Sequence, residues 1–125
     1  IGVRSARRKP YEEALKDHNL IISANRFHEL GPQIVAELVP KSQTLYFTFD
    51  IDVMDPSQAP GTGTPEIGGL FYGEIKECLE ILIKRNNLIG FDMVEVSPMY
   101  DCSERTNQLA AKLIIDILSA KFQKK

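Results

Sequence analysis

The strongest chemical signal in the chain is a pair of aspartates, Asp50 and Asp52, at the end of a run of β-branched and aromatic residues. On an extended strand, residues two apart point to the same face, and their Cα atoms lie roughly 6.6 Å apart. Two carboxylates so arranged can share one small cation or hold two adjacent ones. Hard oxygen ligands suit Mg, Mn or Ca. The pair therefore predicts a metal site, although aspartates at a strand end are also common as structural residues.

A glycine-rich loop follows the aspartates at once. Residues 60–65 read Pro-Gly-Thr-Gly-Thr-Pro, and residues 68–70 read Gly-Gly-Leu. The glycines at 61 and 63 permit a close approach that a Cβ would hinder, so this loop is predicted to face a ligand. The Gly-Gly pair is instead predicted to form a tight structural turn.

Composition and charge narrow the class of protein. The chain has 125 residues, of which 43% are hydrophobic and 26% charged, as expected for one globular unit with its own core. Its formal net charge of -2 argues against a general nucleic-acid partner. The basic residues at Arg4, at 7–9 and at 124–125 are predicted to lie on solvated ends.

Location is predicted from what the sequence does not contain. No segment has the run of apolar residues that a membrane span needs, and no secretory signal opens the chain. The two cysteines, Cys78 and Cys102, lie apart and form neither a disulfide framework nor a zinc motif. A soluble protein of the reducing cytoplasm, with no membrane or nucleic-acid partner, is therefore predicted.

Hydrophobic periodicity predicts alternating strands and helices. Strands are predicted at 1–4, 20–23, 44–50 and 88–96, and helices at 11–17, 26–30, 32–39, 72–84 and 104–122. Gly31 closes the second helix and Pro32 starts the third. The alternation, with strands apolar on both faces, predicts one α/β domain over residues 1–125, of three layers, α/β/α, with a mostly parallel sheet.

Ligands of such sheets bind beyond the carboxyl ends of the strands. Asp50 and Asp52 stand at the end of one predicted strand, and Glu95 stands at the end of the next. We therefore expect the three carboxylates to share one edge of the sheet.

Residues 47–56 and 60–70 together resemble the signature of the ureohydrolases, the family of arginase, agmatinase and guanidinobutyrase. In that family a strand ending in Asp-x-Asp-x-x-Asp-Pro runs into a Gly-Thr-Gly-Thr-Pro loop and a Gly-Gly-Leu turn. Residues 90–101 resemble the family's last strand and the loop after it, and Ser97 brings this run nearer to agmatinases than to arginases. The resemblance covers nearly the whole chain and implies the C-terminal part of a single ureohydrolase domain.

The resemblance implies a binuclear manganese hydrolase of a small guanidinium substrate, which as an agmatinase would convert agmatine to putrescine and urea for polyamine biosynthesis. By position, Asp50 would bridge the two metals and Asp52 would bind one of them. Glu95 would accept hydrogen bonds from the guanidinium, and Thr64 would help to place it. No residue of this chain is assigned as a catalytic nucleophile. The family's habit of assembly implies a homo-oligomer.

These residue types suit the reaction on chemical grounds. A guanidinium is a resonance-stabilised cation and a poor electrophile, so its hydrolysis at neutral pH needs a strong nucleophile. Two metals that share a carboxylate can lower the pKa of a water between them from about 15.7 towards about 7. A carboxylate such as Glu95 matches the planar donors of the guanidinium bidentately and fixes its carbon above the nucleophile.

The chain also departs from the family pattern. Two further metal-ligand motifs of the family, Gly-Gly-Asp-His and Asp-Ala-His-x-Asp, do not occur in it. The first residue, Ile1, opens a strand-like run with no initiating methionine. We therefore expect the chain to supply part of the site in a longer protein, and the isolated chain to be inactive. The family's strand order places another strand between the first two strands and the last two, which predicts an unpaired strand edge here.

Two other interpretations of the same residues stay open. A phosphotransferase of the haloacid-dehalogenase type also has a hydrophobic strand followed by Asp-x-Asp, although it leaves the Gly-Thr-Gly-Thr-Pro loop unexplained. A non-catalytic protein built from a degenerate ureohydrolase segment is the second alternative.

The remaining polar residues are predicted to be structural. His18 and His28 lie in polar surroundings and are predicted to be surface residues rather than metal ligands. Asp55, before a proline, is predicted to be a turn residue. Asp92 is predicted to support the structure from the opposite face of its strand. Asp101 either lines the mouth of the pocket or caps the last helix.

Overall fold

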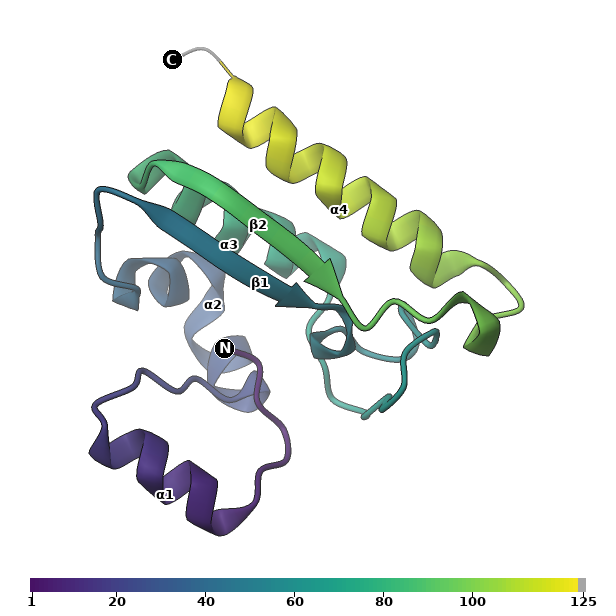
Figure 1. The fold of residues 1–125 in the computed structure, drawn as a ribbon, viewed down its shortest axis with the longest axis horizontal. Helices are drawn as coiled ribbons and strands as arrows, with labels where there is room; N and C mark the ends of the chain where they lie inside the picture. The colour runs from purple at the N-terminus through teal and green to yellow at the C-terminus, as the bar shows by residue number, and fades with distance from the viewer. Residues whose placement is uncertain (124–125) are drawn as a thin grey trace.

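The structure is a computed structural model that describes residues 1–123; Lys124 and Lys125 lie outside the described residues. Its elements in chain order are α1 (Arg8–Lys16), α2 (Ala24–Leu38), β1 (Leu45–Asp50), the 3-10 helix η1 (Ile51–Val53), α3 (Tyr72–Arg85), β2 (Leu88–Val94), the 3-10 helix η2 (Pro98–Tyr100) and α4 (Arg105–Phe122). From β1 onwards strands and helices alternate along the chain, as the periodicity predicts, whereas α1 is followed directly by α2 (Figure 1).

The sheet consists of β1 and β2, which pair in parallel. Aromatic and β-branched side chains favour the extended conformation of β1, and its burial alternates with a period of two. The register places Thr48 opposite Asp92 and Asp50 opposite Val94. The carboxyl ends of the two strands therefore lie side by side, as the predicted site requires.

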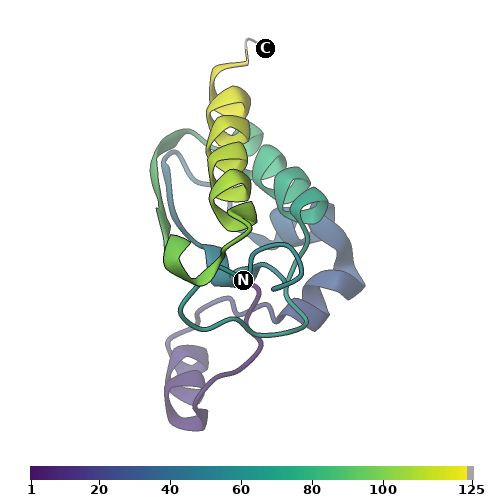
Figure 2. The same cartoon turned by 90° about the vertical axis from the view of Figure 1, so that its right-hand side faces the viewer.

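One face of the sheet carries the core. Helices α2, α3 and α4 lie on the same side of the sheet (Figures 1 and 2). Phe47 and Phe91 stack with ring centroids 5.6 Å apart and pack against Ile83 of α3 and Ile117 of α4. Phe49 enters the larger core with α2 and α3. Residues 1–123 thus form an α/β fold with a parallel sheet and one of the two predicted helical layers.

The predicted strands at 1–4 and 20–23 are wrong in extent. Each contributes one residue to a single parallel bridge, between Val3 and Ser23. The extended conformation ends there because Ser23 caps α2, its hydroxyl accepting a hydrogen bond from the Arg26 N–H at 3.1 Å. Capping satisfies a free N–H of the helix and competes with strand pairing.

The break inside α2 agrees with the sequence. Gly31 has φ 78° and ψ 162°, a conformation that interrupts the helix, and Pro32 follows it. Helix α1 begins at Arg8, earlier than predicted, with Pro10 in its first turn, where the missing N–H is tolerated. It buries no residue and lies away from the other helices (Figure 1). Among the described residues, no helix has the length and apolarity that crossing a membrane requires.

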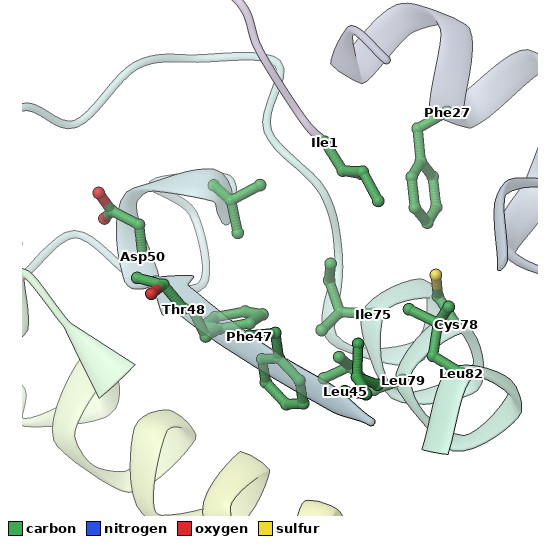
Figure 3. A pocket seen from close by; sticks show the side chains of 12 residues that line it. Ile1, Phe27, Leu45, Phe47, Thr48, Asp50, Ile75, Cys78, Leu79 and Leu82 are labelled. Carbon is green, nitrogen blue, oxygen red and sulfur yellow. The ribbon is translucent and has the colours of Figure 1, made fainter. Parts of the chain in front are cut away.

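One edge of β1 has no neighbouring strand within residues 1–123, in agreement with the predicted unpaired edge. An apolar cavity of about 250 Å³ lies between β1, α3 and the N-terminal residue. Figure 3 shows Ile1 and Phe27 facing Cys78 and Leu82 across this cavity. Asp50 stands at its end, with the carboxylate directed away from the apolar side chains.

Candidate functional site at the strand ends

The two aspartates do not continue one strand. Strand β1 ends at Asp50 and Asp52 belongs to η1, so the predicted extended geometry through both residues is wrong. The Asp50 carboxylate accepts a hydrogen bond from the Asp52 N–H at 3.0 Å, and such a local bond favours a turn over the strand. The turn keeps the carboxylates close to each other. The pKa of Asp50 is raised mainly by burial, and the nearby negative charges of Asp52 and Glu95 raise it further.

Glu95 lies at the same edge of the sheet. Val94, the last residue of β2, pairs with Asp50, and Glu95 follows it directly. The predicted strand to position 96 ends early because Glu95 has φ 61°, a left-handed conformation that costs a non-glycine residue about 1–2 kcal/mol. Strained backbone of this kind gathers at functional sites. The Glu95 side chain is exposed and therefore open to a ligand.

The glycine-rich loop passes beside Glu95 and is hydrogen-bonded to Asp52. A Cβ built on Gly63 would lie 3.4 Å from Glu95 Oε2, so this part of the loop passes beside the glutamate. The Thr64 hydroxyl donates a hydrogen bond to Asp52 Oδ2 at 3.1 Å. The structure thus brings together all four residues that the sequence selected, Asp50, Asp52, Thr64 and Glu95.

The electrostatics of the aspartate pair suit a cation. None of the ion pairs formed within residues 1–123 involves Asp50 or Asp52, so their negative charges face one another and Glu95 without a basic partner. Carboxylate oxygens are the donors that hard divalent cations prefer. Within the same range, no group of three or more His, Cys, Asp or Glu side chains is arranged to hold a metal ion. This chain therefore offers two carboxylate ligands at one place.

Sequence reasoning missed Arg4, which was predicted to be solvated. Its side chain is 10% exposed, and its guanidinium donates to the carbonyl oxygens of Val53, at 3.1 Å, and of Asp52. Arg4 thus fixes the main chain of η1 and with it the direction of the Asp52 side chain. Only its position at the end of a strand-like run could have drawn attention to it, because its partners lie far along the chain.

Asp55 holds the two ends of the loop together, as its place before a proline suggests. One carboxylate oxygen accepts from the Ser57 N–H at 2.9 Å. The other accepts from the N–H groups of Gly68, at 2.9 Å, and Gly69, at 3.3 Å. These bonds, with those from Ser57 first, lower the pKa of Asp55. The Gly-Gly pair is a structural turn, since Gly68 has φ 84° and a Cβ on Gly69 would overlap the Met54 backbone.

The other polar residues stand outside the site. His28 Nδ1 lies 2.9 Å from Glu74 Oε1 and links α2 to α3. The Asp92 carboxylate accepts from the Tyr46 hydroxyl at 2.6 Å on the exposed face of the sheet. Asp101 lies three residues before Glu104, the N-cap of α4, and its carboxylate accepts from the Thr106 N–H in the first turn at 2.8 Å, which favours the capping alternative for this residue.

Comparison with known proteins assigns the family. The model of the arginase family matches residues 1–119. The chain belongs to the arginase family. The predicted ureohydrolase relationship is therefore confirmed, and the haloacid-dehalogenase alternative is dropped.

Individual relatives of this arginase-family chain include agmatinases, as the run around Ser97 predicts. It is 41% identical over 121 residues to the agmatinase of Bacillus subtilis (strain 168), an alignment that covers 94% of the chain and 40% of the relative. The chain thus spans about two fifths of that relative's length.

Solved structures show the same fold. The proclavaminate amidino hydrolase of Streptomyces clavuligerus has a TM-score of 0.88 and 36% identity, over 97% of this chain and 42% of that one. The agmatine ureohydrolase of Thermoplasma volcanium has a TM-score of 0.84 and 34% identity, over 94% of this chain and 40% of that one.

Proposed function

We propose that this chain supplies part of the active site of a metal-dependent ureohydrolase, and that the full-length protein hydrolyses agmatine to putrescine and urea. One observation carries the proposal: Asp50, Asp52, Thr64 and Glu95 converge at the carboxyl ends of two adjacent parallel strands in a chain of the arginase family. Ligands of parallel sheets bind at this edge.

The metal part of the proposal rests on the aspartates. Asp50 would bridge two manganese ions and Asp52 would bind one of them, an assignment supported by two carboxylates that have no basic partner among the described residues. When bound, the ions would supply the charge that turns water into a nucleophile at neutral pH. The Thr64 hydroxyl engages one oxygen of Asp52 and so limits the rotation of a ligand side chain.

The substrate part rests on Glu95. An exposed carboxylate beside a residue without a side chain leaves room for a flat group to lie against it. The two oxygens of Glu95 would accept hydrogen bonds from two guanidinium nitrogens, the bidentate arrangement that fixes both position and orientation. The guanidinium carbon would then be held facing the aspartates, the residues that would hold the metal ions.

The choice of agmatine rests on two observations. Ser97 stands where arginases tend to carry Asn, and agmatinases are among the relatives near 40% identity. We further propose that the protein acts in the cytoplasm as a homo-oligomer. Free thiols at Cys78 and Cys102 suit a reducing compartment, and the assembly follows from the family resemblance.

The test is a side-by-side assay of urea release. The full-length protein, loaded with manganese, would be given agmatine, arginine and guanidinobutyrate at matched concentrations, with the 125-residue chain alone alongside. We expect the highest kcat/KM for agmatine and no urea from the chain alone. Equal or better turnover of arginine or guanidinobutyrate would contradict the choice of agmatine. No urea from any of the three would favour the non-catalytic alternative.

A further inference from the structure

We propose that Asp101 and Thr106, at the start of α4, are positioning residues that hold the glycine-rich loop against the end of β2 and thereby set the place of Thr64 relative to Glu95. The inference rests on the proposed function, because it concerns the geometry of that site. The hydrogen bonds of the two side chains go to Ser103, to Gly61 and to each other rather than to the four residues of the site, so both act through the loop.

The two side chains are buried and fully engaged. Asp101 is 4% exposed and Thr106 is 0% exposed. One oxygen of Asp101 accepts from the Ser103 N–H at 3.0 Å and the Ser103 hydroxyl at 2.6 Å. The other accepts from the Thr106 N–H at 2.8 Å and the Thr106 hydroxyl at 2.7 Å. Four donated hydrogen bonds keep this carboxylate ionised in a buried place.

The direction of the hydrogen bonds is fixed by the charge of Asp101. An ionised carboxylate can only accept hydrogen bonds, so the Thr106 hydroxyl must donate its hydrogen bond to Asp101. Its lone pairs are then available to the Gly61 N–H, which donates to Thr106 Oγ1 at 2.8 Å. The hydrogen bonds therefore run in one direction, from the Gly61 N–H to the Thr106 hydroxyl and from that hydroxyl to the Asp101 carboxylate.

Gly61 is held from two sides. Its N–H is bound to Thr106, while its carbonyl oxygen accepts from the Ser97 N–H at 2.8 Å. Ser97 stands two residues beyond Glu95 on the same segment. A Cβ on Gly61 would lie 2.7 Å from the Asp101 Cβ and 2.9 Å from Thr106 Oγ1, so only glycine fits between the loop and α4.

The hydrogen bonds at Gly61 affect the site through Gly63 and Thr64, which follow it in the loop. Gly63 passes beside the Glu95 carboxylate, and Thr64 donates to Asp52. Any shift of Gly61 therefore moves the loop against both groups. Displacing reacting groups by about 1 Å can cost about a hundredfold in rate, so the hydrogen bonds at Gly61 matter to the chemistry although they lie outside it.

Helix capping alone does not explain this arrangement. A cap needs only the bond from the Thr106 N–H to Asp101, and that bond does not involve the Thr106 side chain. The hydroxyl adds the link to Gly61, 45 residues earlier in the chain. Thr106→Val keeps the shape and the N–H but removes the link, whereas Thr106→Ser keeps the hydroxyl.

The first test measures hydrogen exchange at the Gly61 amide in the full-length protein. For Thr106→Val we expect the Gly61 amide to exchange at least about tenfold faster, as when a buried partner is lost, while amides in the middle of α4 keep their rates. Thr106→Ser is expected to restore slow exchange at Gly61. Unchanged exchange at Gly61 in Thr106→Val would overturn the proposal, and so would equal acceleration throughout α4.

The second test measures urea release by the full-length protein. We expect Thr106→Val to lower kcat by about ten- to a hundredfold at a temperature where it is fully folded, and Thr106→Ser to stay within about threefold of the unmodified protein. Equal kcat for both variants and the unmodified protein would contradict a positioning role. If the unmodified protein releases no urea, the proposed function fails, and the exchange experiment alone decides whether Thr106 holds the loop.

Discussion

Replacing the two loop glycines one at a time is expected to separate the fold of the loop from its chemistry. Gly61 and Gly63 occupy the same loop but have different surroundings. A Cβ on Gly61 would meet the buried side chains of Asp101 and Thr106, at 2.7 and 2.9 Å. A Cβ on Gly63 would meet only the end of the Glu95 side chain, at 3.4 Å.

The expected magnitude for Gly61→Ala follows from these contacts. Asp101 and Thr106 are fixed by their mutual hydrogen bonds, so neither can move aside, and overpacking of this kind costs about 1–3 kcal/mol. Displacement of Gly61 also breaks its bond to Thr106, worth about 1 kcal/mol. We expect the free energy of unfolding to fall by about 2–4 kcal/mol, a large part of the stability of a typical domain.

Gly63→Ala is the matched control. Its new methyl group would be in ordinary contact, so the free energy of unfolding should stay within about 0.5 kcal/mol of the unmodified chain. The same methyl group narrows the space beside Glu95, so kcat/KM of the full-length protein should fall. The variant is thus expected to lose activity without losing stability.

Urea unfolding of the full-length variants, followed by circular dichroism, measures both free energies, and the urea-release assay measures kcat/KM. The reasoning predicts a large stability loss in Gly61→Ala and a selective activity loss in Gly63→Ala. Equal stability of the two variants would refute it, because the tight contacts at Gly61 would then have no energetic effect.

Three further predictions concern charge and completeness. Hydrogen bonds from Ser103 and then Thr106 lower the pKa of Asp101, so the stability that the ionised carboxylate contributes is present above about pH 4 and is lost as the pH falls below that value. Asp101→Asn should therefore be less stable than the unmodified protein at pH 7 and lose less stability on acidification, and an equal loss of unfolding free energy in both proteins between pH 7 and pH 3 would disprove this. Glu95→Gln should lower kcat/KM for agmatine by about ten- to a hundredfold, as expected for loss of a charged hydrogen bond worth about 1.5–3 kcal/mol, and an unchanged urea-release rate would remove Glu95 from substrate binding. The 125-residue chain alone should release no urea in the presence of manganese, and measurable turnover would show that it holds a complete site.

Much of the fold could be predicted because local rules determine it. The aromatic and β-branched run produces β1, and Gly31 before Pro32 breaks α2 at the expected place. The site at the carboxyl ends followed from parallel pairing. Glu95 could be placed at the sheet edge, but its positive φ could not be foreseen, because a glutamate adopts that conformation only when its surroundings impose it.

The missed features depend on contacts between distant parts of the chain. The turn at η1 is held by Arg4, 48 residues before Asp52, and strand periodicity gives no sign of it. Thr106 is linked to Gly61 across 45 residues. An Asp before Ser and Thr at a helix start does suggest a cap, so the contact between Asp101 and Thr106 could be predicted from the sequence. The hydrogen bond from Gly61 to Thr106 could not be predicted.

The most direct test of the central claim measures bound metal and activity together in the full-length protein, with and without Asp50→Asn. Asp50 is placed at a strand end, outside the apolar core, so the variant should keep its fold by circular dichroism. Elemental analysis should show at least one manganese ion fewer per chain than in the unmodified protein, and urea release from agmatine should be abolished. Full manganese occupancy in a folded Asp50→Asn protein would contradict the assignment of the strand-end aspartates as metal ligands.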